Sequence, residues 1–80
     1  MNLKTNNGKV MFLFRHANKS IELIDNFLNL VDQGVIIFKE GVRNYLYNNR
    51  ENFLDNLRTL SALETEADIT KRKIENILYT

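Results

Sequence analysis

Residues 60–78, LSALETEADITKRKIENIL, carry a helical pattern with an acidic residue where a leucine is expected. The apolar positions alternate in steps of three and four, which is typical of a helix that packs along another helix. Extended back to residue 53, the predicted contact row is Phe53, Leu57, Leu60, Glu64, Ala67, Lys71, Ile74 and Leu78. A carboxylate in such a row costs free energy unless it is paired, protonated or bound to a cation. Glu64, with Asp68 one turn later, is therefore the first candidate site.

A second and more regular row precedes this stretch. It predicts a first helix over residues 18–47, whose contact row is Ile21, Ile24, Leu28, Val31, Val35, Phe38, Val42 and Tyr45. Residues 48–50, Asn-Asn-Arg, supply the break, because asparagine accepts left-handed backbone and caps helix ends. With Asn49 as N-cap, the second helix is expected over residues 51–79. The sequence thus predicts an all-α fold, a long antiparallel helical hairpin over residues 18–80.

The first 17 residues are predicted to form an N-terminal tail and an apolar lid segment. Residues 1–9 show no periodicity, and Val10 to Phe14 form a short apolar run that is expected to fold back on a helix end, with an edge strand as the alternative. Asn18 and Ser20 are the candidate N-caps of the first helix. His16 is the only histidine, so we expect a surface residue there rather than a metal ligand.

The overall composition limits the class of protein. The chain has 80 residues, a net charge of +1, no cysteine and no proline, which fits one α-helical domain and excludes disulfides and thiolate-metal sites. Near-neutral charge and the lack of a long apolar stretch predict no nucleic-acid binding, no membrane insertion and a cytoplasmic location. Further apolar residues lie outside both rows, so the hairpin is expected either to complete its core by self-association, as a homo-oligomer, or to be the front part of a longer bundle.

Two glycines lie seven residues apart in the first helix. Gly34 and Gly41 share one side of it, and each costs about 1 kcal/mol relative to alanine in a helix interior. Two interpretations are open. They are tolerated surface glycines, or they allow the close approach of a neighbouring helix or a bound group.

The carboxylate pair predicts a metal site. In a hairpin that turns near residue 49, facing residue numbers sum to about 98, which places Glu64 near Gly34 and Asp68 near Leu30. An oxygen-rich helical site suits a divalent or iron-type metal. The alternative is that Glu64 simply pairs with Lys71 or with a lysine of a partner. No catalytic set of residues is visible, so we do not expect an enzyme.

Two segments resemble a known family. LETEADITKRKIENIL (63–78) resembles the E-x-x-x-D helix of PhoU-like phosphate-uptake regulators, and VMFLFRHANKSIELIDNFLNLV (10–31) resembles the opening of the branch that accompanies Pit-type phosphate transporters. The resemblance covers about residues 10–80. It implies a bundle of long antiparallel helices, and it matches Glu64 and Asp68 to an acidic motif that binds metal clusters in some members.

The resemblance implies a function by binding rather than by chemistry. The chain would regulate phosphate transport in the cytoplasm by docking on a Pit-type phosphate transporter or a phosphate-sensing partner. Members are longer and carry a second acidic motif, so the chain is expected to correspond to an N-terminal portion. The competing hypothesis is a coiled-coil type oligomerisation module with no ligand.

Overall fold

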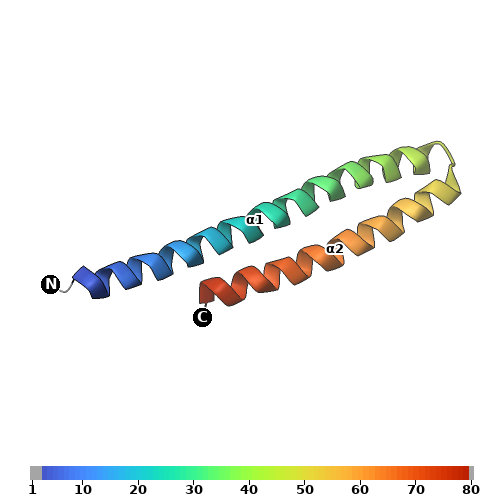
Figure 1. Ribbon diagram of the computed structural model, residues 1–80. Coiled ribbons are helices and arrows are strands. Elements are labelled where there is room, and N and C mark those ends of the chain that lie inside the picture. The colour runs from blue at the N-terminus through green and yellow to red at the C-terminus, as the bar shows by residue number, and fades with distance from the viewer. Residues whose placement is uncertain (1–2, 80) are drawn as a thin grey trace.

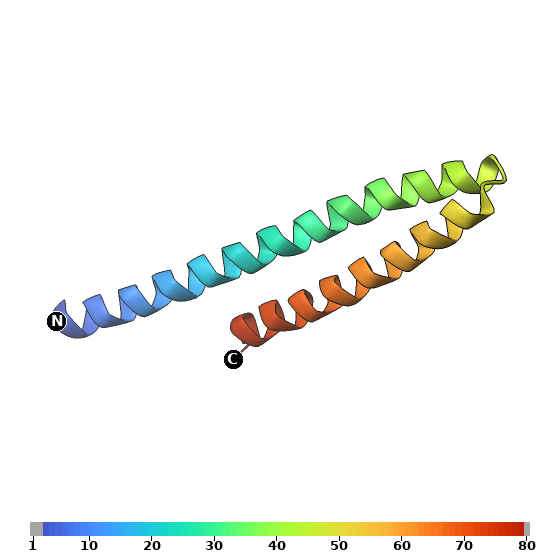
Figure 2. The ribbon, with the colours of Figure 1, turned by 45° about the vertical axis from the view of Figure 1, so that its right-hand side comes forward.

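The molecule is an antiparallel hairpin of two helices, which confirms the predicted all-α fold. A computed structural model describes the backbone of residues 3–79 and the side chains of residues 8–79. Helix α1 spans Leu3–Leu46 and helix α2 spans Arg50–Tyr79. Figures 1 and 2 show the two helices side by side, with α1 extending well beyond the C-terminal end of α2. The hairpin measures 70 × 16 × 12 Å, and its radius of gyration of 19.5 Å exceeds the roughly 12 Å of a compact domain of this length.

The first helix begins much earlier than the sequence pattern predicted. Residues 3–17, expected to be a tail and an apolar lid, continue α1 without a break, so that prediction is wrong for these residues. Asn18 and Ser20 lie in the helix interior and cap nothing. The Ser20 hydroxyl instead donates a hydrogen bond to the backbone carbonyl of His16 (2.9 Å), the local bond that lets a serine sit inside a helix. Residues 1–2 of the expected tail lie outside the described residues.

The turn follows the asparagine chemistry that the sequence indicated. Asn48 has a φ of 57°, in the left-handed region that asparagine tolerates better than most residues. The amide of Asn48 donates to the carbonyl of Tyr45 (3.2 Å), and the amide of Asn49 donates to the carbonyl of Asn44 (2.8 Å). These two bonds are the Schellman pattern that closes a helix C-terminus. Asn49 is the N-cap of α2, as predicted, and its carbonyl accepts the first helical bond from Phe53 (3.0 Å).

The contact between the helices uses a different set of residues from the predicted rows. All non-exposed side chains among residues 8–79 follow a three-four repeat on the facing sides of α1 and α2, which we call the inner seam. On α1 it comprises His16, Ser20, Leu23, Phe27, Leu30, Gly34, Ile37, Gly41 and Asn44. On α2 it comprises Phe53, Asn56, Leu60, Leu63, Ala67, Thr70, Ile74 and Ile77.

Small and polar side chains allow the helices to approach closely along this seam. A Cβ added at Gly41 would lie 3.5 Å from the Cβ of Asn56, and one added at Gly34 would lie 3.8 Å from Cδ1 of Leu60. Of the two interpretations of these glycines, the close approach of a neighbouring helix is therefore confirmed. The side-chain amide of Asn44 also donates to Oδ1 of Asn56 (2.6 Å) and ties the turn end of α1 to α2.

Candidate functional site

The predicted acidic site lies on an outer edge of α2. Glu64 and Asp68 are both exposed, so Glu64 is not a buried carboxylate in a contact row, and that prediction is wrong. The inner seam passes through Leu63 and Ala67 instead. The residue closest to Gly34 across the hairpin is Leu60 rather than Glu64. The four-residue spacing still places both carboxylates on one edge, where they line a shallow hollow of about 460 Å³ together with Phe27 and Lys71.

The charged groups around this edge pair within α2. Arg72 lies 3.0 Å from a carboxylate oxygen of Asp68, and Lys71 lies 3.6 Å from Glu75 rather than pairing with Glu64. All these side chains are largely exposed, and such pairs contribute only a few tenths of a kcal/mol. Within the described part of the chain, no three acidic or histidine side chains come together as a metal-binding group.

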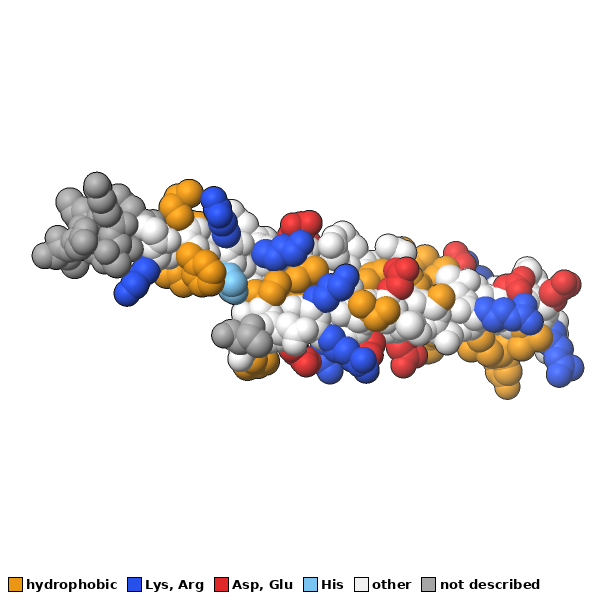
Figure 3. Space-filling model, turned by 60° about the horizontal axis from the view of Figure 1, so that its bottom comes forward, with side chains coloured by type: hydrophobic (Ala, Val, Ile, Leu, Met, Phe, Trp, Pro, Cys, Tyr) orange, Lys and Arg blue, Asp and Glu red, His pale blue; other side chains and the backbone are white. Residues whose placement is uncertain are grey.

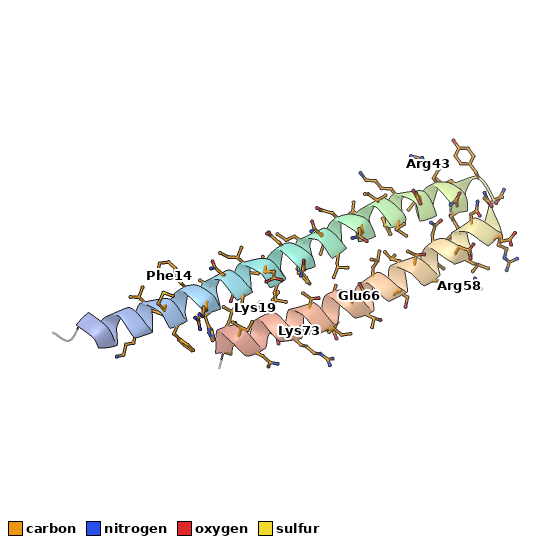
Figure 4. The ribbon with its side chains drawn as sticks, in the orientation of Figure 1. Phe14, Lys19, Arg43, Arg58, Glu66 and Lys73 are labelled. Carbon is orange, nitrogen blue, oxygen red and sulfur yellow. The ribbon has the colours of Figure 1, made fainter. Side chains whose placement is uncertain are left out.

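The most extensive unpartnered feature is an apolar stripe on α1. The residues predicted to face α2, from Ile21 to Tyr45, are exposed, so their assignment as the main contact between the helices is wrong, although Tyr45 at the turn end lies against Phe53 of α2. Because α1 continues to Leu3, their three-four spacing extends further toward the N-terminus than the sequence interpretation recognised. We call the complete set the outer stripe; it comprises Val10, Phe14, Ala17, Ile21, Ile24, Leu28, Val31, Val35, Phe38, Val42 and Tyr45. Figure 4 shows Phe14 on the part of α1 that extends beyond α2.

The outer stripe and the inner seam lie on adjacent sides of α1. At 3.6 residues per turn, the two rows are about 100° apart around the helix, because each outer-stripe residue from Ala17 to Tyr45 directly follows a residue of the inner seam. The inner seam of α1 includes two glycines, a serine, an asparagine and a histidine, whereas every residue of the outer stripe is apolar. The side of the helix best suited to burial is therefore the one that α2 leaves uncovered. A helix with two adjacent seams is built to pack against two neighbours.

A hollow between the helices joins the outer stripe to α2 near the turn. Its volume is about 280 Å³, and its lining is Ile37, Phe38, Gly41, Val42, Tyr45, Phe53, Asn56, Leu57 and Leu60. The rings of Tyr45 and Phe53 close its turn end, with centroids 5.4 Å apart. Three residues of the outer stripe and Leu57 of α2 share this lining, so they belong to the same face of the hairpin. Figure 3 shows hydrophobic side chains gathered near the turn end.

The two broad faces of the hairpin differ in polarity, and the outer stripe lies on the apolar one. Along the same face, α2 contributes Leu54 and Leu57 near the turn, and then Ser61, Glu64, Asp68 and Lys71 further along. The opposite side of α1 carries a third row with the same three-four spacing, and its residues are mostly polar. They are Lys19, Glu22, Asn26, Asn29, Gln33, Ile36, Glu40 and Arg43. The hairpin is thus amphipathic, with one apolar face and one polar face.

The amount of exposed surface indicates an incomplete core. Among residues 8–79, Leu23 is the only hydrophobic residue that is buried. The accessible surface is 6850 Å², whereas a compact protein of 9.4 kDa exposes about 5,000 Å². The excess is therefore about 1,850 Å² per chain, which matches what one subunit contributes to an obligate dimer interface, roughly 1,000–2,500 Å².

Sequence reasoning identified most of the outer stripe but assigned it to the wrong contact. It missed Val10, Phe14 and Ala17, although their spacing continues the row without a gap. The hollow near the turn carried no sequence signal of its own, because its lining alternates between two helices. Asn44 and Asn56, which meet across the inner seam, were missed because polar side chains do not mark a contact row.

Within residues 3–79, neither helix has a stretch apolar and uncharged enough to cross a bilayer. Comparison with protein-family models, curated proteins and solved structures finds no match for this chain.

Proposed function

We propose that the chain is a protein-interaction module that associates with a second copy through the apolar face of the hairpin and forms a four-helix bundle. The observation that carries this proposal is the outer stripe, an unbroken apolar row of eleven positions that lies in solvent. Large contiguous apolar patches on a single chain mark interaction surfaces. Four-helix bundles bury such rows between helices that pack in the same three-four repeat.

Two neighbouring residues of α1 provide the test. Val35 lies in the outer stripe with 48% of its surface exposed, and Ile36 lies on the polar side with 57% exposed. In the single hairpin, glutamate at either position would be solvated and equally tolerated. In the bundle, Val35→Glu buries a carboxylate from each copy, which costs several kcal/mol and weakens association by at least about 100-fold.

Sedimentation velocity of the two variants distinguishes these cases. Val35→Glu is expected to sediment as a monomer, while Ile36→Glu retains the mass of the unmodified protein. Equal behaviour of the two variants would exclude the outer stripe as the contact surface.

A second candidate function rests on the acidic edge of α2. We infer from the resemblance to PhoU-like regulators that Glu64 and Asp68 bind a divalent or iron-type cation, and that the module acts on a Pit-type phosphate transporter or a phosphate-sensing partner. The position of both carboxylates around one hollow supports this proposal. Carboxylates on one helix edge offer the oxygen ligands that hard cations prefer.

A matched pair elsewhere on α2 provides the control for metal binding. Glu51 and Asp55 have the same four-residue spacing, and Asp55 pairs with Arg58 (3.0 Å) much as Asp68 pairs with Arg72 (3.0 Å). Titration calorimetry with Mg²⁺, Mn²⁺ and Fe²⁺ should show binding that Glu64→Ala with Asp68→Ala abolishes and that Glu51→Ala with Asp55→Ala preserves. Equal binding by all three proteins would reject the acidic edge as a metal site.

A further inference from the structure

We propose that the outer stripe of α1 packs antiparallel against the outer stripe of a second copy, about a two-fold axis that passes close to Val31 and Val35. In this arrangement Ile21 of one chain meets Tyr45 of the other, Ile24 meets Val42, and Leu28 meets Phe38. The inference rests on the self-association proposed above and adds its orientation and its register.

The polar edge of α2 indicates that α1 of one copy packs on α1, not on α2, of the other copy. Face-to-face packing of two hairpins can place α1 either over α1 or over α2 of the other copy. Beyond Leu57, the edge of α2 on the apolar face carries Ser61, Glu64, Asp68 and Lys71. Packing the stripe against this edge would bury carboxylates against Leu28 and Val31 without a partner, which is costly. Packing stripe against stripe buries only apolar side chains along α1, and the polar edges of the two α2 helices then face each other.

Charges beside the stripe select the antiparallel orientation. On the side of α1 away from α2, the charged residues next to the stripe are Asp25, Asp32 and Lys39. In the antiparallel pair, Asp25 of each copy lies across from Lys39 of the other, which gives two opposite-charge contacts. In a parallel pair these residues would face the positions of Ser20, Phe27, Gly34 and Gly41, which carry no charge. Charge complementarity is thus available only to the antiparallel pair.

Charge and contact length together select the register. A shift of one heptad that lengthens the contact toward Phe14 brings Asp25 of one copy opposite Asp32 of the other, twice. The opposite shift brings Asp32 of one copy opposite Lys39 of the other, twice, but it removes Ile21 and Ile24 from the contact and shortens it. The proposed register has two Asp–Lys contacts and one contact between the two Asp32 side chains at the axis, which is the best balance of charge and buried length.

The hollow near the turn fits this register. Phe38 and Val42 form part of its wall, and in the proposed pair they meet Leu28 and Ile24 of the second copy. An isoleucine or leucine side chain from that copy would fill apolar space that α2 leaves open. Such filling recovers dispersion contacts that a void forfeits.

Cysteine crosslinking tests orientation and register directly, because the native chain contains no cysteine. Single variants Ile24→Cys, Val42→Cys and Val35→Cys are prepared, and pairs are mixed, oxidised in air and identified by intact mass. The mixture of Ile24→Cys with Val42→Cys is expected to give the mixed disulfide as the main product, while each variant alone stays largely unlinked.

Each other outcome overturns the inference in a distinct way. Self-linked Ile24→Cys and Val42→Cys would show a parallel pair. A main product between Ile24→Cys and Val35→Cys would show the register shifted toward Phe14. A dimeric mass without any disulfide would show that the stripe either is not the contact or packs in the register shifted away from Phe14, and both cases contradict the proposed pairing. A monomeric mass would contradict the proposed self-association itself.

Charge exchange provides a second readout. Lys39→Asp replaces both opposite-charge contacts with like-charge contacts and is expected to weaken association about tenfold. Combining Lys39→Asp with Asp25→Lys restores both contacts and should recover the native affinity. A double variant no tighter than Lys39→Asp alone would contradict the pairing of residues 25 and 39.

Discussion

The glycines of the inner seam offer a quantitative test of the hairpin itself. An alanine Cβ at Gly41 would lie 3.5 Å from Asn56 Cβ, and one at Gly34 would lie 3.8 Å from Leu60 Cδ1, both ordinary van der Waals distances. Neither glycine has a positive φ, so alanine enters without backbone strain. Each Gly→Ala change should therefore stabilise the fold by about 1 kcal/mol through helix propensity.

The two changes should add, because the sites are about 10 Å apart along the helix and contact different residues. The combined gain of about 2 kcal/mol should raise the melting temperature by roughly 8–16 °C for a domain of this size. Leucine should have the opposite effect at residue 41, since its side chain cannot fit beside Asn56. Separating the helices there should cost about 1–3 kcal/mol.

Gly8 is the matched control for these substitutions. It lies in the part of α1 beyond α2, and an added Cβ would meet nothing within 4 Å. Gly8→Leu should therefore leave stability unchanged or slightly raised. Thermal and urea unfolding followed by circular dichroism at 222 nm, at one fixed chain concentration, measures all five variants, the double alanine variant included. A loss of stability in Gly41→Ala, or equal effects of leucine at residues 8 and 41, would refute the close approach of the helices.

Two further predictions concern the turn end of the hairpin. Asn48→Ala should lower the free energy of unfolding by about 1 kcal/mol, because alanine adopts the left-handed backbone at φ 57° less readily than asparagine. Asn48→Gly should leave stability unchanged or raise it. Urea unfolding in which the alanine variant is more stable than the glycine variant would contradict the Schellman turn. Asn44→Ala should lower the free energy of unfolding by about 1–2 kcal/mol, because it leaves the side-chain oxygen Oδ1 of Asn56 without its 2.6 Å donor in a half-buried contact. The double change Asn44→Leu with Asn56→Leu should recover most of that loss. Unfolding curves with no difference between wild type and Asn44→Ala would show that the bond does not contribute.

The fold class and the turn could be predicted from the sequence because their signals are local. Asparagine at residues 48 and 49, the absence of proline, and two rows with three-four spacing suffice for an antiparallel hairpin. The predicted start of α1 is wrong because residues 1–9, which include Asn6, Asn7 and Gly8, show no apolar periodicity and therefore predict a tail. In a continuous helix such residues weaken propensity without ending the helix.

The face of α1 that packs on α2 could not be predicted, because α1 carries two rows, the inner seam and the outer stripe, with the same three-four spacing. Apolarity favoured the row from Ile21 to Tyr45, whereas α2 packs on the row that contains Gly34 and Gly41. On α2, Phe53, Leu60, Ala67 and Ile74 were assigned correctly, and the intervening positions were off by one residue. That one-residue error put Glu64 in the seam in place of Leu63. The acidic edge therefore remains a prediction about an exposed surface.

The native mass is the most direct test of self-association through the outer stripe, since the stripe is buried only if another chain covers it. Sedimentation equilibrium of the unmodified protein, over a concentration range of about 1–100 µM, gives that mass without reference to shape. Association through the outer stripe predicts a mass of about 19 kDa, twice the chain mass of 9.4 kDa, at micromolar concentration. A mass of 9.4 kDa throughout that range would contradict it.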